Sequence, residues 1–207
     1  MAVKRDISRK EKIYEKYCSD VYPRIKKIRG SNRLKKTLSI ISGRKDFSGA
    51  KEYWDNRYRE GKTSGEGSYG KIAKFKADQL NKFVKEKDVQ SVIEFGCGDG
   101  NQLSMGEYPK YIGLDISRRS IKICKDKFSN DKTKSFFLYD PDCFINNNAL
   151  NAELGISLDV IYHLVDKKIF KKHVHHLFRS SEKYVIIYSS NKNIQNKADR
   201  KSTRLNS

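Results

Sequence analysis

The stretch SVIEFGCGDGNQL, Ser91–Leu103, decides the fold of this chain. An apolar, β-prone run is followed by three glycines at alternate positions, Gly96, Gly98 and Gly100. A dinucleotide-binding turn has the spacing GxGxxG, whose third glycine lets the helix pack closely on the strand. Asn101 stands at that position, and no Gly-Lys-Ser/Thr follows as it does in a P-loop. The turn is therefore predicted to bind a ligand other than a pyrophosphate.

Two carboxylates indicate which ligand. Glu94, at the end of the predicted strand, would repel a pyrophosphate and suits a ligand with an ammonium group. Asp115, in YIGLDIS, ends the next predicted strand about 20 residues after the turn, where an acid can accept hydrogen bonds from both hydroxyls of a ribose. A nucleoside with a cationic amino group satisfies both, and S-adenosylmethionine (SAM) is such a molecule.

Predicted strands and helices alternate after the turn. Strands are predicted at 91–96, 111–115, 135–139, 154–160 and 184–189. Helices are predicted near 101–106, 118–128 and 166–180. This alternation is typical of α/β domains with a mostly parallel sheet and helices on both faces. Ligands bind such sheets beyond the carboxyl ends of the strands, which places the predicted site at 94–101.

The motifs VIEFGCGDG, YIGLDIS and SLDVIYHL together resemble those of class I SAM-dependent methyltransferases, over about residues 50–190. The run YWDNRYREGKTSGEGSYG resembles a bacterial branch of that family. The resemblance implies a Rossmann-like fold in which the glycine turn wraps the methionine part of SAM. Glu94 would then hold the amino group, Asp115 the ribose, and Asp140 or Asp142 would lie near the adenine.

The same resemblance implies that aromatic residues and the 63–70 loop cover the cofactor. The implied cofactor-binding residues are Tyr53, Trp54, Ser68, Gly70, Glu94, Gly96, Cys97, Gly98, Gly100, Asp115, Ile116 and Asp140. We interpret Cys97 as a small packing residue rather than a nucleophile.

The resemblance further implies seven strands in the order 3-2-1-4-5-7-6, of which five can be recognised in this sequence. We therefore expect the sheet to lack its last two strands. Residues 199–207, DRKSTRLNS, match the translation of a common sequencing-library adapter. We interpret them as an artefact that follows a C-terminally truncated SAM-binding domain at 51–198.

Residues 1–50 are predicted to form a basic helical extension. They carry 15 Lys and Arg against 5 Asp and Glu, within a formal net charge of +19 for the chain. Helices are predicted at 6–29 and about 31–41. The first has a thin apolar face: Ile13, Tyr14, Tyr17, Val21, Ile25 and Ile28. Such a face suits packing on the main domain or a partner, with weak membrane-surface contact as an alternative.

A further amphipathic helix is predicted at 71–87. Its inward side chains are predicted to be Ile72, Phe75, Leu80, Phe83 and Val84.

Methyl transfer needs alignment of acceptor and methyl group, and a hydroxyl or amine acceptor also gains from a base. SLDVIYHL supplies two candidate catalytic residues. Asp159 either contacts the cofactor or acceptor or caps the next segment. His163 is either a base or a structural histidine.

The motif HVHH, at 173–176, falls in a predicted helix and has no evident carboxylate or thiolate partner. We therefore interpret it as a solvated helix face, and no metal site is predicted.

These features predict an enzyme that transfers a methyl group from SAM to an oxygen or nitrogen of a small-molecule or glycan acceptor. One alternative is an RNA or other nucleic-acid methyltransferase, which the positive charge favours. Another is a SAM-binding remnant without catalysis. The (N/D)PP(Y/F) motif of DNA amino-methylating enzymes is missing, because SLDV stands in its place. Without a secretory signal or an apolar run of membrane-spanning length, we expect a cytoplasmic protein.

Overall fold

The computed structural model describes residues 10–20, 48–164 and 166–189. Its centre is a five-stranded sheet in the order β3-β2-β1-β4-β5, in which all neighbouring strands are parallel. The strands are β1 (Val92–Phe95), β2 (Tyr111–Asp115), β3 (Lys134–Leu138), β4 (Ala152–Leu158) and β5 (Ser181–Tyr188). The predicted α/β class and the order of the five predicted strands are confirmed.

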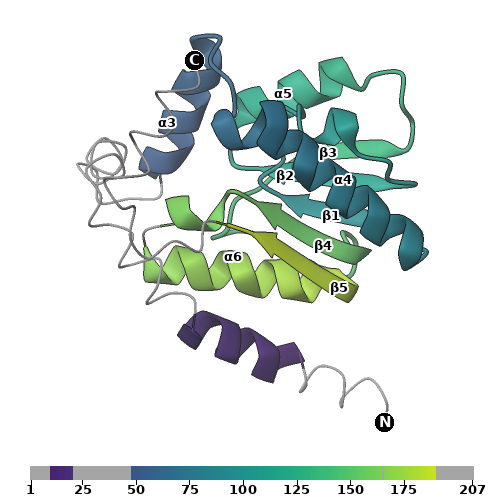
Figure 1. Ribbon diagram of the computed structural model, residues 1–207. Helices are drawn as coiled ribbons and strands as arrows, with labels where there is room; N and C mark the ends of the chain where they lie inside the picture. Colours follow the sequence, from purple (N-terminus) through teal and green to yellow (C-terminus); the bar gives the residue numbers. More distant parts are fainter. Residues whose placement is uncertain (1–9, 21–47, 165, 190–207) are drawn as a thin grey trace, which may run out of the picture.

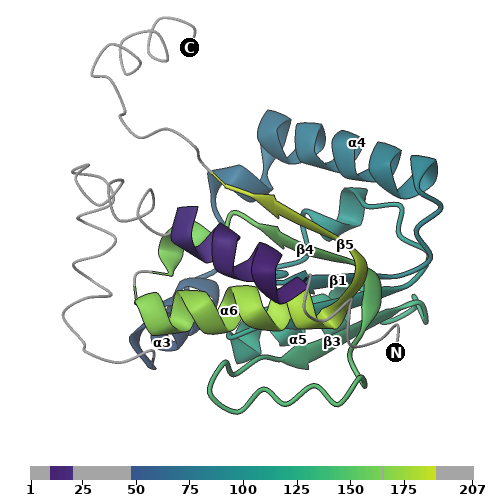
Figure 2. The ribbon, with the colours of Figure 1, turned by 90° about the horizontal axis from the view of Figure 1, so that it is seen from below.

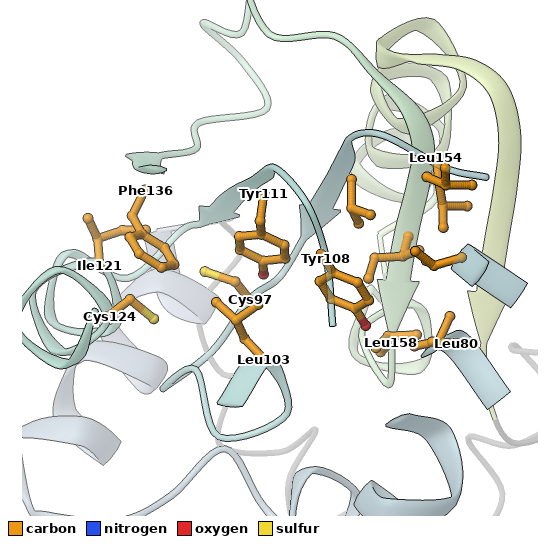
Figure 3. Close-up of a cluster of buried hydrophobic side chains, with 14 residues drawn as sticks. Leu80, Cys97, Leu103, Tyr108, Tyr111, Ile121, Cys124, Phe136, Leu154 and Leu158 are labelled. Atoms are coloured by element: carbon orange, nitrogen blue, oxygen red, sulfur yellow. The ribbon is translucent and has the colours of Figure 1, made fainter. Parts of the chain in front are cut away.

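Helices cover both faces of this sheet (Figure 1). Helices α4 (Gly70–Glu86) and α5 (Arg118–Lys127) lie on one face, and α6 (Lys167–Ser180) lies on the other. The strand residues alternate accordingly. Val92 belongs to the apolar cluster beneath α4 and α5, whereas Ile93 and Phe95 belong to the cluster beneath α6. Figure 3 shows the first cluster, in which Tyr111 of β2 and Cys97 lie between side chains of β3 and α5 on one side and Leu103 and Tyr108 on the other.

Three short 3-10 turns and the helix α3 (Ser48–Arg59) lie between these elements or precede them, and an N-terminal helix at 10–20 is described below. The turns are η1 (Glu66–Ser68), η2 (Leu103–Met105) and η3 (Ile161–His163). The loop of residues 60–69, between α3 and α4, is called the cover loop below. The helix predicted near 101–106 is only the single turn η2, because Gly106 takes an extended conformation directly after it. Strand β4 ends at Leu158 rather than at residue 160, because the next residue has a φ of 60°.

The predicted inward face of α4 is only partly correct. Leu80 and Val84 are buried, but Ile72 and Phe75 are 49% and 56% exposed. The first half of the helix instead turns Ala73, Lys76 and Ala77 toward the sheet. This half lies over polar groups at the strand ends, where Lys76 finds a charged partner, so the apolar pattern alone gave the wrong face.

The N-terminal helix at 10–20 packs along the outer side of α6 (Figure 2). Tyr14 donates a hydrogen bond to the carbonyl oxygen of Lys171 at 3.2 Å, and Cys18 is buried in the same contact. Packing of this segment on the main domain is therefore confirmed for the described part. Ile13, predicted in the apolar face, is 50% exposed. Tyr17 packs against the same cluster as Cys18. The predicted face residues Val21, Ile25 and Ile28, the helix predicted at 31–41 and the 199–207 tail lie outside the described residues.

None of the helices in the described parts of the chain is long and apolar enough to cross a membrane.

Candidate functional site

A cavity lies beyond the carboxyl ends of β1, β2 and β4, where the sequence predicted the ligand. It is enclosed by the glycine turn, α3, the cover loop, η3 and part of α6. The predicted cofactor residues on its lining are Trp54, Ser68, Glu94, Gly96, Cys97, Gly98, Asp115 and Ile116. Both predicted catalytic residues, Asp159 and His163, lie on the lining as well. Residues from the glycine turn, from YIGLDIS and from SLDVIYHL therefore line the same cavity.

The glycine turn passes close to its neighbours at two positions. Gly96 has a φ of 95°, and a Cβ atom there would lie 2.3 Å from Cγ2 of Val160. Gly98 has a φ of 57°, and its Cβ would lie 2.4 Å from Oγ of Ser64. Both the dihedral angles and the contacts favour glycine. The main chain of the turn itself therefore forms this wall of the cavity.

Glu94 is a buried carboxyl group on the lining, with 3% of its surface exposed. The hydroxyl of Tyr111 donates a hydrogen bond to its Oε2 at 2.5 Å. Burial raises the pKa of Glu94 to about 7, although the Tyr111 hydrogen bond and the charge of Lys76 act in the opposite direction. A cation in the cavity would favour the ionised form, so Glu94 suits a ligand with an ammonium group.

Asp115 is held by the main chain around it. The N–H of Gly98 donates to its Oδ2 at 2.9 Å, and the N–H of Ser117 donates to its Oδ1 at 2.8 Å. Burial raises the pKa of Asp115 to about 6, and these two hydrogen bonds oppose the rise. Each carboxylate oxygen has a second lone pair. Asp115 can therefore still accept hydrogen bonds from hydroxyl groups in the cavity.

The cover loop is fastened to the glycine turn through Asp99. Oδ2 of Asp99 accepts hydrogen bonds from the N–H of Ser64 at 2.8 Å and from the hydroxyl of Tyr69 at 2.9 Å. In return, the N–H of Asp99 donates to Oγ of Ser64 at 2.9 Å. Asn101 donates from Nδ2 to the carbonyl oxygen of Ser68 at 2.7 Å. The residue that replaces the third glycine of a dinucleotide fingerprint thus holds the cover loop.

Some residues predicted to bind the cofactor do not line the cavity. They are Tyr53, Gly70, Gly100 and Asp140. Asp140 is exposed, and its Oδ1 accepts a hydrogen bond from the N–H of Asp142 at 2.9 Å. Its neighbours Tyr139 and Pro141 line the cavity instead. Tyr53 packs edge-on against Trp54, with ring centroids 5.3 Å apart, so Trp54 is the member of this aromatic pair that faces the cavity.

Asp159 is paired with a lysine that the sequence did not single out. Nζ of Lys76 lies 2.6 Å from Oδ2 of Asp159, and the Lys76 side chain is only 2% exposed. The ammonium group also lies 5.3 Å from the ring centroid of Tyr188. A Cβ atom at Gly67 would lie 2.6 Å from the same oxygen of Asp159. Asp159 therefore connects α4, the cover loop and the end of β4 at the cavity.

His163 lies in η3 against the aromatic wall. Its ring is 5.4 Å from that of Trp54 in an edge-on arrangement. Burial lowers the pKa of His163 to about 4, and the charge of Arg57 adds to this effect. The imidazole is therefore neutral at physiological pH, with one ring nitrogen able to accept a proton.

The interpretation of HVHH as a solvated helix face is wrong. His173 is buried on the cavity lining, and its Nε2 lies 3.0 Å from Oγ of Ser157. His176 places Nδ1 2.8 Å from the hydroxyl of Tyr139. Of the three histidines, His175 alone is exposed. Burial lowers the pKa of His173 to about 3, so it remains neutral. Among the described residues, no group of His, Cys, Asp and Glu side chains could hold a metal ion.

Gln102 is a lining residue that sequence reasoning missed. It is 5% exposed, and its Nε2 donates to the carbonyl oxygen of Ala73 at 3.0 Å. Its Oε1 is buried and has no hydrogen-bond partner within the described part of the chain. The only sequence signal was its position in the motif, two residues after Gly100.

The side chains on the cavity lining that carry a full charge are acidic. Four carboxyl groups line the cavity: Glu94, Asp99, Asp115 and Asp159. Neither lysine nor arginine is found among the described lining residues. The residues present therefore fit a ligand that carries positive charge, such as an ammonium or sulfonium group, better than a phosphate.

The sequence is similar to a curated methyltransferase over part of its length. No family model matches the chain. The small RNA 2'-O-methyltransferase of Arabidopsis thaliana is 30% identical over 105 residues, which are 45% of this chain and 11% of that protein. The chain thus spans about a tenth of the length of this curated relative.

Solved methyltransferase structures are similar over a larger part of the chain. Magnesium protoporphyrin IX methyltransferase from Synechocystis PCC 6803, with bound SAH, has a TM-score of 0.50 and 16% identity, over 69% of this chain and 71% of that chain. An amino pentose methyltransferase from Micromonospora echinaspora, with bound SAM, has a TM-score of 0.50 and 13% identity, over 67% and 56%. This chain has the Rossmann-like fold of class I methyltransferases. At these identities the likeness establishes the fold alone.

Proposed function

We propose that this chain binds SAM in the cavity and acts as a methyltransferase. The observation that carries the proposal is the pair of buried carboxyl groups, Glu94 and Asp115, at the ends of adjacent strands on one lining. Bound SAM would supply an activated methyl group. Glu94 would hold its ammonium group, and Asp115 would accept the ribose hydroxyls. Trp54 and the cover loop would exclude water from the bound cofactor.

The acceptor in this proposal is a hydroxyl or amine of a small molecule or glycan. Neutral His163 lies on the lining and would take the proton that the acceptor loses. Asp159, held by Lys76, would orient the acceptor through a hydrogen bond to its carboxylate. Because Lys76 already balances its charge, Asp159 suits a neutral hydroxyl group better than a second cation.

A second candidate is methylation of RNA. It is favoured by the similarity to a small RNA 2'-O-methyltransferase and by the excess of Lys and Arg in the sequence. The 2'-hydroxyl of a ribose is also a neutral hydroxyl, so the same base and the same orienting carboxylate would serve it. The third possibility, binding of SAM without turnover, predicts cofactor affinity but no methylated product.

The first test is calorimetric titration of residues 1–198 with S-adenosylhomocysteine (SAH), using NADH as the control ligand. Binding of SAH alone supports the proposal, and binding of NADH alone overturns it. Incubation of the protein and SAM with a glycan pool or with RNA oligonucleotides then separates the acceptors, because each transfer adds one methyl mass. A chain that binds SAH and methylates neither favours the non-catalytic alternative.

A further inference from the structure

A groove lies at one edge of the sheet, between α5 and β3. These two elements are neighbours (Figure 1), and β3 is the outermost strand on its side of the sheet. The groove has a volume of about 370 Å³, at the lower end of the range that ligand pockets show. Three lysines and three phenylalanines line it: Lys125, Lys132, Lys134, Phe128, Phe136 and Phe137. None of these described residues lines the cavity at the strand ends, so the groove is a separate feature.

The groove carries an excess of positive charge. Lys134 forms an ion pair with Asp131, the only acidic side chain among the described lining residues. Lys125 and Lys132 are exposed, and neither pairs with an acidic side chain in the described part of the chain. A lysine ammonium is a compact point charge that suits a phosphate. Two lysines therefore remain to bind an anionic ligand.

Aromatic rings lie beside these lysines. Phe128 and Phe136 stack on each other, with ring centroids 5.7 Å apart, and Phe136 is buried. Phe137 is 43% exposed, and Leu138, the next residue of the strand, is 42% exposed. Two large apolar side chains thus stay uncovered at the end of β3, and the ring of one of them lines the groove.

The lysines indicate what could cover these apolar side chains. Lysine at an edge strand opposes pairing with a further strand, and Lys132 and Lys134 stand just before β3 and at its first residue. The ligand should instead combine negative charge with flat apolar groups. Single-stranded nucleic acid has both, because its phosphates bind lysines and its bases stack on aromatic side chains.

Strand β3 connects the groove to the cavity. Its first residue, Lys134, lines the groove, and Tyr139, directly after its last residue, lines the cavity. The 5 residues between these two ends of the strand span about 16 Å. On the side of α5, a Cβ atom at Gly100 of the glycine turn would lie 2.9 Å from Cε2 of Phe128. A strand of a few nucleotides can therefore follow β3 from the groove to the cavity.

We propose that this groove binds single-stranded RNA, with Lys125 and Lys132 at the phosphates and Phe137 against a base. The inference deepens the second candidate above, methylation of RNA, and rests on that part of the proposed function. It predicts two separable effects, since the lysines act on the charge of the strand and Phe137 acts on its bases.

The test measures, by fluorescence anisotropy, the binding of a labelled single-stranded RNA of about 12 nucleotides and of an abasic strand of the same length. We expect Phe137→Ala to weaken RNA binding roughly tenfold and to leave the affinity for the abasic strand within about twofold. The double variant Lys125→Gln/Lys132→Gln should weaken the binding of both strands. It should also lower the slope of log affinity against log salt by roughly 1.4, because each lost phosphate contact contributes about 0.7.

Matched controls lie on α4, outside the groove. Phe75→Ala removes a phenylalanine that is 56% exposed, and Lys85→Gln/Lys87→Gln removes two exposed lysines. Neither control should change RNA binding as the groove variants do. Equal effects of groove and control lysines would assign RNA binding to the general positive charge and overturn the inference. Equal loss of RNA and abasic strand in Phe137→Ala would overturn it as well.

Calorimetric titration with SAH separates this inference from the proposed function. SAH affinity should be unchanged in the groove variants, because their residues do not line the cavity. An unmutated chain that binds SAH but not RNA overturns the inference alone. A chain that binds RNA through the groove but does not bind SAH overturns the proposed function alone.

Discussion

Nζ of Lys76 and Oδ2 of Asp159 lie 2.6 Å apart, although the two residues are 83 positions apart in the sequence. Both side chains are largely shielded from solvent, with 2% and 16% of their surfaces exposed. The pair joins the middle of α4 to the end of β4, where the backbone of Asp159 takes a φ of 60°. It therefore fixes a candidate catalytic residue on the cavity wall.

We expect Lys76→Met to destabilise the fold by roughly 3 kcal/mol, because it leaves the carboxylate of Asp159 buried without its counter-charge. The double variant Lys76→Met/Asp159→Asn should recover part of this loss, since asparagine is neutral and tolerates the positive φ. Urea unfolding followed by circular dichroism measures the free energy of unfolding of each variant.

Lys74→Met on the same helix is the control for this ion pair. Lys74 pairs with Asp78 on the surface, where both side chains are more than half exposed. Its loss should therefore change the free energy of unfolding by less than about 1 kcal/mol. Equal losses in the free energy of unfolding for the two single substitutions would mean that the buried Lys76–Asp159 pair stabilises the fold no more than the exposed pair does.

The sequence allowed the sheet and the position of the cavity beside the glycine turn to be predicted, because both depend on local patterns. The strands alternate with helices, and the glycine turn, Glu94 and Asp115 follow from the ends of two such strands. The aromatic pair before the cover loop was predicted as a unit. Only the structure shows that Trp54 faces the cavity and Tyr53 does not.

Long-range polar contacts could not be predicted in the same way. Lys76 lies on a helix whose apolar residues suggested another face, and its burial depends on Asp159, far along the chain. His173 was assigned to a solvated helix face because the sequence showed no carboxylate or thiolate partner for it. In the fold it faces Phe95, with ring centroids 5.8 Å apart, and approaches Ser157. Such pairings depend on which strands become neighbours, and a motif does not encode that.

The affinity for SAH should depend on pH through Glu94. Burial raises the pKa of this carboxyl group to about 7, so below that pH an ammonium ligand must first displace its proton. We expect the dissociation constant to rise roughly tenfold between pH 8 and pH 6. Glu94→Gln should bind SAH more weakly at pH 8 and show little change over this range. A pH dependence that persists in this variant would assign the proton to another group, such as Asp115.

Glu94→Gln should also make the empty protein more stable at high pH. The folded-state pKa is above the unfolded value of 4.5, so Glu94 destabilises the fold as pH rises from about 4.5 to 7. At pH 8 we expect the variant to gain on the order of 2–3 kcal/mol, and at pH 4 almost nothing. Thermal unfolding at both pH values measures this difference.

Exposed Glu86→Gln is the control, and its melting temperature should change little at either pH. A lower melting temperature for Glu94→Gln at pH 8 would show that the Tyr111 hydrogen bond outweighs the burial of charge.

Asp99 should control how long the cavity stays closed. Its carboxylate accepts hydrogen bonds from Ser64 and Tyr69 of the cover loop, so Asp99→Ala removes both. We expect faster amide hydrogen exchange over residues 62–69 and roughly tenfold faster dissociation of SAH, while the melting temperature changes little because the loop is exposed and lies outside the core. Hydrogen-exchange mass spectrometry and stopped-flow displacement measure the two effects.

Asp126→Ala is the control, because it removes an exposed ion pair with Lys122. It should leave the exchange rate of the cover loop and the dissociation rate of SAH unchanged. Unaltered exchange in the cover loop of Asp99→Ala would mean that Asn101 and the 3.0 Å hydrogen bond between the hydroxyls of Tyr58 and Ser64 hold the loop without Asp99.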